Sequence, residues 1–199
     1  MTTTNGFGDD IAAAKRQLRS EMLGLRERLH QQPGDVSTRL CEQFHQFWVP
    51  ASKTVISGFW PVRNEVDLRP LFHDLHARGC TIVLPVVVAK RSPLAFRLWT
   101  PATNLVSGQF GIPIPPEGAP TCDPDWLMVP FLAYDQEGFR IGYGGGFYDI
   151  TLANLRRKKS VFAIGVGFDS QRVERVPVNS NDERLDAIMT ERRVLLVGG

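Results

Sequence analysis

The chain has 199 residues, of which 43% are hydrophobic and 22% are charged, so we expect one domain over residues 1–199 that buries a core without disulfide staples. Its 23 basic and 21 acidic residues leave a formal charge of +2, which argues against nucleic acid or an anionic membrane as a partner. Any anion-binding site must therefore be built locally by a few residues.

The N-terminal part predicts a polar tail and two helices. Residues 1–10 are rich in Thr, Asn and Gly and lack the apolar stretch of a signal peptide, and no apolar run in the chain approaches the roughly 20 residues that span a bilayer. Apolar residues recur at steps of three and four over 10–30, which predicts an amphipathic helix. A Pro-Gly pair at 33–34 ends it, and Asp35 or Ser37 caps a second helix.

A β-α-β pattern follows. The β-branched runs at 54–59 and 81–88 predict two strands, and the amphipathic segment 68–78 between them predicts a helix that Gly79 ends. Nearly continuous apolar strands of this kind are typical of a parallel sheet covered on both faces. Alternation over 94–99 predicts a further strand at the edge of the sheet.

The second half begins with a proline-rich stretch and then returns to strand signals. Six prolines within 101–125 predict a long connection. Strands are predicted at 126–130, 161–166 and 193–197, with a helix at 148–158 between the first two. We therefore expect an α/β fold with three αβα layers around a mostly parallel, Rossmann-like sheet.

The most informative segment leads through a glycine-rich loop into the predicted helix at 148–158. Gly142 and the run Gly144–Gly146 permit close approach of a ligand to the backbone, and the start of the helix presents free N–H groups that favour phosphate. Arg140 adds a permanently charged fork before the loop, and Asp149 after it can cap the helix or hold a cation. The spacing matches neither the Walker loop nor the dinucleotide fingerprint, so a phosphate site and a simple tight turn both remain open.

Further segments add a resemblance that covers nearly the whole chain. The motifs are KRQLR at 15–19, FWPVRNE at 59–65, GIPIP at 111–115, VPFLAYD at 129–135, RIGYGGGFYD at 140–149, GFDSQ at 167–171, VPVNSND at 176–182 and TE at 190–191. In this order and spacing they resemble the 5-formyltetrahydrofolate cyclo-ligase (methenyltetrahydrofolate synthetase) family.

The resemblance implies an enzyme that uses ATP as co-substrate and Mg²⁺ to convert 5-formyltetrahydrofolate to 5,10-methenyltetrahydrofolate, with release of ADP and phosphate. ATP phosphorylates the formyl oxygen, and the N10 amine then closes the ring and expels phosphate. The implied partners are small molecules, a reduced folate and ATP. We expect a monomer, and we expect it in the cytoplasm, because Cys41, Cys80 and Cys122 lie far apart and form no CxxC pair.

The resemblance also implies roles for particular residues. The implied ATP contacts are Lys15, Arg16, Arg19, Arg140, Gly142, Tyr143, Gly144, Gly145, Gly146, Phe147 and Tyr148. The implied catalytic residues are Arg140 and Tyr148, and the implied folate contacts are Trp60, Glu65, Tyr143 and Phe147. The implied Mg²⁺ ligands are Asp149 and Asp182.

Each role has a simpler structural alternative. Lys15 and Arg19 are four residues apart on the first helix and could form a solvated basic face. Glu65 could be an acid that complements a helix start, Asp149 could be a helix cap, and Asp182 could be a turn residue within Asn-Ser-Asn-Asp.

Three departures from the family pattern and two competing functions complete the sequence analysis. Gly145 stands where some family members carry Lys, Phe147 stands where Tyr is frequent, and Leu68 and Ile150 occupy positions that are often polar or basic in family members. One competing function is a sugar-phosphate isomerase or coenzyme A transferase of related fold, in which Glu65 would be the base or nucleophile. The other is a non-catalytic paralogue that binds folate or nucleotide, against which the presence of Arg140 and both aspartates argues.

Overall fold

A seven-stranded sheet organises the computed structural model, which describes residues 6–31 and 34–198. The strand order is β11-β10-β9-β6-β1-β2-β3, with the inner strands parallel and both edge strands antiparallel. The strands are β1 (Val55–Ser57), β2 (Thr81–Val86), β3 (Ala95–Trp99), β6 (Trp126–Pro130), β9 (Phe162–Val166), β10 (Ala187–Met189) and β11 (Val194–Leu196). The predicted α/β fold with a mostly parallel sheet is confirmed.

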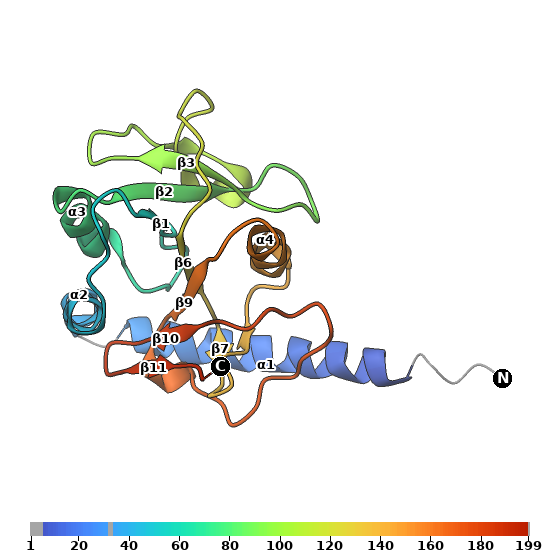
Figure 1. The fold of residues 1–199 in the computed structure, drawn as a ribbon. Helices are drawn as coiled ribbons and strands as arrows, with labels where there is room; N and C mark the ends of the chain where they lie inside the picture. Colours follow the sequence, from blue (N-terminus) through green and yellow to red (C-terminus); the bar gives the residue numbers. More distant parts are fainter. Residues whose placement is uncertain (1–5, 32–33, 199) are drawn as a thin grey trace.

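Helices cover both faces of this sheet (Figure 1). On one face lie α2 (Val36–Phe47) and α3 (Arg69–Ala77), which bury side chains such as Phe44 and Phe72 against the strands. On the other face α4 (Phe147–Arg156) buries Leu152 and Leu155 in a second apolar cluster. Apolar strands sandwiched between two such clusters explain the nearly continuous hydrophobic runs in the sequence.

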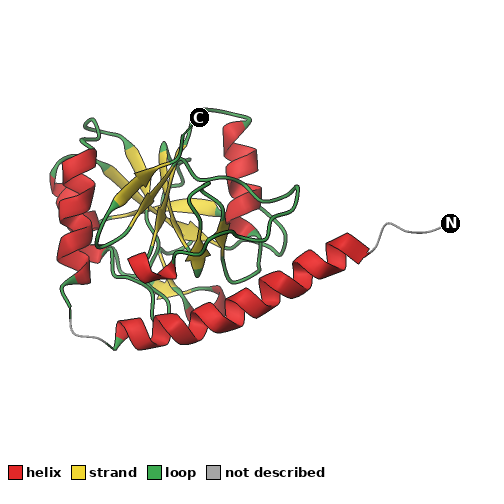
Figure 2. Cartoon of the chain, turned by 90° about the horizontal axis from the view of Figure 1, so that it is seen from below, coloured by secondary structure: helices red, strands yellow, loops and turns green. Residues whose placement is uncertain are grey.

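The first helix, α1 (Gly6–His30), lies outside these two layers. It packs against the hairpin formed by β7 (Ala133–Tyr134) and β8 (Arg140–Ile141), where Met22 joins Ile141 and Val176 in a small core. Figure 2 shows α1 running along one side of the molecule, with its N-terminal end beyond the sheet. The helix thereby brings its basic side chains to the hairpin and to the glycine-rich loop that follows it.

Several boundaries differ from the sequence predictions. α1 begins at Gly6, inside the expected tail, of which residues 1–5 lie outside the described part. Asp35, rather than Ser37, caps α2 by accepting a hydrogen bond from the Thr38 backbone at 3.2 Å. Pro33 also lies outside the described residues. Across the described chain, no helix has both the length and the apolar character needed to cross a bilayer.

The shortest elements escaped the sequence analysis. They are the hairpin β7–β8, the parallel strand β10, and a ribbon of β4 (Val106–Ser107) and β5 (Pro113–Ile114) with an intervening 3-10 turn η1 (Gln109–Gly111). A second 3-10 turn is η2 (Asp169–Gln171). Strands of two or three residues are too short to show a period-two pattern. The expected long connection over 101–125 therefore contains a small ribbon.

Candidate functional site

The basic face of α1 meets the glycine-rich loop. The Arg19 Nε donates a hydrogen bond to the Gly142 carbonyl at 2.9 Å. A Cβ at Gly144, whose φ is +97°, would stand 3.3 Å from the guanidinium carbon of Arg19. A side chain at position 144 would therefore strain the left-handed backbone and crowd the Arg19 guanidinium, so glycine is favoured for both reasons.

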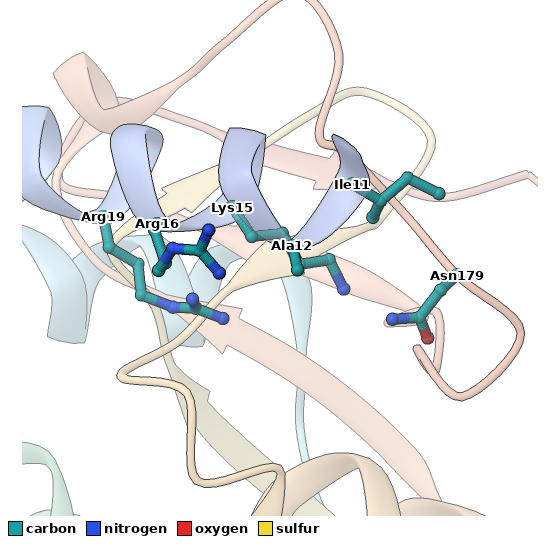
Figure 3. A pocket seen from close by; sticks show the side chains of 6 residues that line it. All are labelled: Ile11, Ala12, Lys15, Arg16, Arg19 and Asn179. Atoms are coloured by element: carbon teal, nitrogen blue, oxygen red, sulfur yellow. The ribbon is translucent and has the colours of Figure 1, made fainter. Parts of the chain in front are cut away.

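A pocket of about 230 Å³ lies beside this contact. It is lined by Ile11, Ala12, Lys15, Arg16, Arg19 and Asn179. Figure 3 shows the three cationic side chains extending from α1 into the space that Asn179 also borders. Three cationic side chains line this pocket and no acidic side chain is among its lining residues, so its charge is suited to an anion.

Lys15 pairs with Asp182 across one edge of this pocket. The Lys15 ammonium donates to Oδ2 of Asp182, and both side chains are largely buried. The same oxygen accepts a bond from the Asn179 backbone at 2.6 Å, which folds residues 179–182 into a tight turn. Asp182 is thus the turn residue that its sequence context suggested, and it also faces the predicted phosphate-binding lysine.

Asp149 lies in a second polar cluster next to that turn. Arg140 donates to Oδ1 of Asp149 at 3.0 Å and to the Glu183 carbonyl at 2.8 Å, and the Glu183 N–H donates to the same Oδ1 at 3.1 Å. Asp149 is not the cap of α4, since that position is Gly146 with a φ of +68°. Asp149 and Asp182 come from distant segments, and the Glu183 backbone brings them side by side.

The two aspartates fit a Mg²⁺ ion that is completed by other ligands. All their hydrogen bonds within the described chain use Oδ1 of Asp149 and Oδ2 of Asp182, which leaves one oxygen of each carboxylate without a donor. No group of three potential metal ligands occurs among the described residues. Mg²⁺ commonly takes one or two carboxylates together with substrate phosphates and water, so two free carboxylate oxygens beside a basic pocket match this ion.

Glu65 lies at the end of the loop that follows β1. Its carboxyl group is buried, and Oε2 accepts a hydrogen bond from the Val62 backbone at 2.9 Å. Burial raises the pKa of Glu65, while the Val62 N–H and the Arg26 charge act in the opposite direction. Glu65 precedes the first turn of α3, so the helix-start alternative does not apply. A buried carboxylate with one oxygen fixed by the backbone can accept directed hydrogen bonds from a ligand.

The predicted aromatic site residues Trp60, Phe147 and Tyr148 lie in different local environments. Trp60 packs 6.4 Å from the ring of Trp99 and carries the Arg69 guanidinium over its face at 5.4 Å. Phe147 is half-buried beside Gly145, where a Cβ would lie 2.6 Å from its ring. The pKa of the Tyr148 hydroxyl is raised by desolvation and by the charge of Glu65. Tyr148 therefore stays protonated and can donate a hydrogen bond at neutral pH.

Two arginines that the sequence analysis did not single out complete the site. The ring of Tyr143 lies between the guanidinium groups of Arg26, at 5.2 Å, and Arg63, at 5.7 Å. Arg63 has a left-handed backbone with φ of 53°, which is uncommon outside glycine. Arg26 is only 2% exposed. Arg26 follows Met22 by four positions and so lies on the apolar stripe of the helix. This position is the sequence feature that could have marked Arg26 as a site residue.

Comparisons with known proteins match most of the chain to one family. Residues 11–191 match a family model described as the 5-formyltetrahydrofolate cyclo-ligase family. The chain is 33% identical over 144 residues to the 5-formyltetrahydrofolate cyclo-ligase of Escherichia coli strain K12, covering 70% of this chain and 79% of the relative. It is 31% identical over 150 residues to that of Mycolicibacterium smegmatis, covering 71% and 76%.

Solved structures give the same picture. The Aquifex aeolicus 5,10-methenyltetrahydrofolate synthetase matches with a TM-score of 0.74 and 28% identity, covering 93% of both chains. The Mycoplasma pneumoniae 5,10-methenyltetrahydrofolate synthetase matches with a TM-score of 0.68 at 20% identity, which is a likeness of fold. The likeness thus extends over almost the entire chain.

Proposed function

The chain belongs to the 5-formyltetrahydrofolate cyclo-ligase family, and from this premise we propose how its residues carry out the ATP-dependent conversion of 5-formyltetrahydrofolate to 5,10-methenyltetrahydrofolate. One observation carries the assignment of the site. The cations of α1, the glycine-rich loop and the pair Asp149–Asp182 converge on one edge of the fold, next to the buried carboxylate of Glu65. Family membership favours this reaction over the isomerase, the coenzyme A transferase and the non-catalytic paralogue.

The triphosphate binds between α1 and the glycine-rich loop. Lys15, Arg16 and Arg19 supply positive charge from the helix, and Arg140 supplies it from β8. The start of α4 supports this placement, because its N-cap residue is Gly146, which has no side chain that could accept hydrogen bonds from the first N–H groups of the helix. The first N–H groups of the helix are thereby left for phosphate oxygens. The loop backbone from Gly142 to Tyr148 approaches the same phosphates.

Asp149 and Asp182 would hold Mg²⁺ through the carboxylate oxygens that accept no hydrogen bond within the described chain. When bound, the ion neutralises charge that develops on the transferred phosphoryl group. Arg140 keeps Asp149 in place through the 3.0 Å hydrogen bond to Oδ1 and adds its own charge beside the phosphates. Lys15 would leave Oδ2 of Asp182 to contact phosphate, while Oδ1, which accepts no hydrogen bond within the described chain, is the oxygen proposed to face the ion.

The folate binds on the side of Glu65. Its carboxylate accepts hydrogen bonds from the donor edge of the pteridine, and Trp60, Tyr143 and Phe147 provide apolar surface for the rings. This arrangement directs the formyl group toward the glycine-rich loop. Because Tyr148 is protonated and stands near Glu65, its hydroxyl can donate to the formyl or phosphate oxygen during transfer.

The reaction balances through a phosphorylated formyl group. The formyl oxygen attacks the terminal phosphorus of ATP, a new O–P bond forms, and ADP leaves. N10 then attacks the electrophilic formyl carbon, loses its proton, and the C–O bond breaks to release phosphate. An amide-like oxygen is a poor leaving group until it is phosphorylated, so the protein has to position both substrates and neutralise charge.

The assay for this function follows methenyltetrahydrofolate absorbance with ATP, Mg²⁺ and 5-formyltetrahydrofolate, and omits each component in turn. We expect product only when all three are present. ATP hydrolysis that proceeds equally without the formyl substrate would contradict the assignment. A cytoplasmic monomer remains our proposal for its working state, and the three free cysteines, one of them exposed, suit that reducing compartment.

A further inference from the structure

Arg26 is a buried cation placed between the two substrate sites. It lies on α1 seven residues after Arg19, which is two helical turns along the same face. It is 2% exposed, and its Nε has no hydrogen-bond partner within the described residues. A guanidinium out of water is costly unless it is paired, so the partners that Arg26 does have need an explanation.

Its contacts join the loop on the folate side to the loop on the ATP side. One Arg26 nitrogen donates to the hydroxyl of Tyr143, 117 residues away in the chain, and the guanidinium covers the Tyr143 ring at 5.2 Å. Another Arg26 nitrogen lies 3.8 Å from Oε1 of Glu65. Glu65 belongs to the loop after β1, whereas Tyr143 belongs to the glycine-rich loop before α4. Arg26 contacts both, and it is buried, whereas Arg63, which also lies over the Tyr143 ring, is exposed.

We propose that Arg26 is a positioning residue that fixes Glu65 and Tyr143 in one geometry and so couples the folate pocket to the glycine-rich loop. The proposal rests on the proposed function, because it assigns Glu65 and Tyr143 to the substrates. Arginine suits this position since its planar fork addresses two partners at once, whereas a lysine ammonium is a single point charge. The backbone N–H of Val62 fixes Oε2 of Glu65, and Arg26 faces the other oxygen.

The charges around Glu65 give this role a distinct signature. The groups that face the carboxyl are Arg26 from α1, Arg63 from its own loop, Tyr143 from the glycine-rich loop and Tyr148 from α4. Arg63 is exposed, so solvent screens its charge, while Arg26 is buried. Loss of the Arg26 charge should therefore move the pKa of Glu65 further upward.

The test compares Arg26→Gln with Arg26→Lys and with the control Arg28→Gln. Arg28 is exposed on the same helix and makes no side-chain hydrogen bond among the described residues. For each variant, kcat/KM for 5-formyltetrahydrofolate is measured across pH, ATP affinity is measured by calorimetry without folate, and the thermal melt is recorded. We expect Arg26→Gln to raise the folate KM about tenfold or more, a loss of roughly 1.4 kcal/mol, and to shift the acid limb of kcat/KM to higher pH.

The conservative variant separates charge from geometry. Arg26→Lys should restore the acid limb but leave the folate KM raised, because lysine retains the charge and loses the fork. ATP affinity in the absence of folate should stay within about twofold of wild type in both variants, and Arg28→Gln should behave like wild type. Arg26→Gln could instead lower the melting temperature and weaken the binding of both substrates equally, with the acid limb of kcat/KM at the wild-type pH. In that case Arg26 is only a packing residue and the proposal is wrong.

A second variant keeps the test decisive if Arg26→Gln does not fold. Tyr143→Phe keeps the ring and removes the hydroxyl that Arg26 bonds and that also lowers the pKa of Glu65, so it should raise the folate KM and shift the acid limb to higher pH. A folate KM unchanged in Tyr143→Phe and in Arg26→Lys would overturn the proposal. Calorimetry of folate binding tests the role of Arg26 even if the wild type forms no methenyl product. A wild type that binds folate but forms no product would overturn the proposed function and leave the proposal for Arg26 standing.

Discussion

The ammonium of Lys15 on α1 pairs with the carboxylate of Asp182, 167 residues further along the chain. Lys15 is proposed to contact phosphate and Asp182 to hold Mg²⁺, so without ligands these two groups satisfy each other. ATP must separate Lys15 from Oδ2 of Asp182 for Lys15 to reach phosphate, whereas the oxygen proposed for the ion, Oδ1, accepts no hydrogen bond within the described chain. The pair therefore gives the aspartate variants different expected behaviour.

Asp182→Asn should reduce turnover by about tenfold or more, equivalent to roughly 1.4 kcal/mol in the barrier. It should leave ATP binding in the presence of a metal chelator no weaker than in wild type, because Lys15 is released. Asp149→Asn should reduce turnover to a similar degree and also weaken metal-free ATP binding, since Asp149 orients Arg140. The measurements are turnover against Mg²⁺ concentration and ATP calorimetry with and without chelator. Wild-type turnover of both variants at limiting Mg²⁺ would refute the metal assignment.

Glu65→Gln should raise the KM for the folate and leave that for ATP nearly unchanged. A neutral amide loses the charge-assisted hydrogen bond to the pteridine, which is typically about 1.5–3 kcal/mol. Steady-state kinetics with each substrate varied in turn checks this. An equal effect on both KM values would point instead to a general disruption of the site.

The raised pKa of Glu65 also predicts a dependence of stability on pH. A carboxyl whose pKa is higher in the folded state than its ordinary value of 4.5 binds its proton more tightly when folded. Its contribution to stability is therefore complete below 4.5 and is lost as the pH rises through the folded pKa. Glu65→Gln removes this loss, so the unfolding free energy of wild type should fall relative to that of the variant as the pH rises above 4.5. Denaturant titrations at several pH values measure it, and a constant difference would contradict the raised pKa.

The glycine-rich loop offers two matched alanine substitutions. A Cβ at Gly145 would lie 2.6 Å from the Phe147 ring, whereas at Gly142 nothing lies within 4 Å and the backbone is not left-handed. Gly142→Ala should therefore have the melting temperature of wild type and a lower affinity for ATP, because the added methyl group blocks the approach of phosphate to the backbone. Gly145→Ala should weaken both ATP and folate, since it also displaces Phe147.

Calorimetry with ATP, calorimetry with the folate and thermal melting of the same preparations distinguish these cases. Unchanged ATP affinity in Gly142→Ala, with an unchanged melt, would move the phosphate cradle away from this part of the loop and favour the simple turn.

The sequence predicted the helices and strands whose hydrophobic pattern extends over a long continuous segment. The β1–α3–β2 unit followed from two apolar runs around an amphipathic segment, and its strands are parallel as expected. The hairpin β7–β8 and strand β10 were missed because two or three residues carry no period. The sequence indicated a turn between the strand at 126–130 and the glycine-rich loop, whereas the structure has the hairpin β7–β8 there.

The contacts of the site that the sequence did not predict are long-range contacts. The contact of Arg26 with Tyr143 and the approach of Asp149 to Asp182 through the Glu183 backbone depend on tertiary packing. The sequence analysis did not single out Arg26, because the position of an arginine beside an apolar helical stripe shows neither its burial nor its partners. The roles of the remaining site residues came from the family resemblance, and their geometry came from the structure.

The central claim is that ATP phosphorylates the formyl oxygen, and transfer of an oxygen isotope tests it most directly. 5-Formyltetrahydrofolate carrying ¹⁸O in its formyl group is converted under single-turnover conditions with ATP and Mg²⁺, and the released phosphate is analysed by mass spectrometry. The account predicts one ¹⁸O atom in each phosphate released, together with one methenyltetrahydrofolate formed. Unlabelled phosphate beside labelled water would contradict it, because the formyl oxygen would then have left without being phosphorylated.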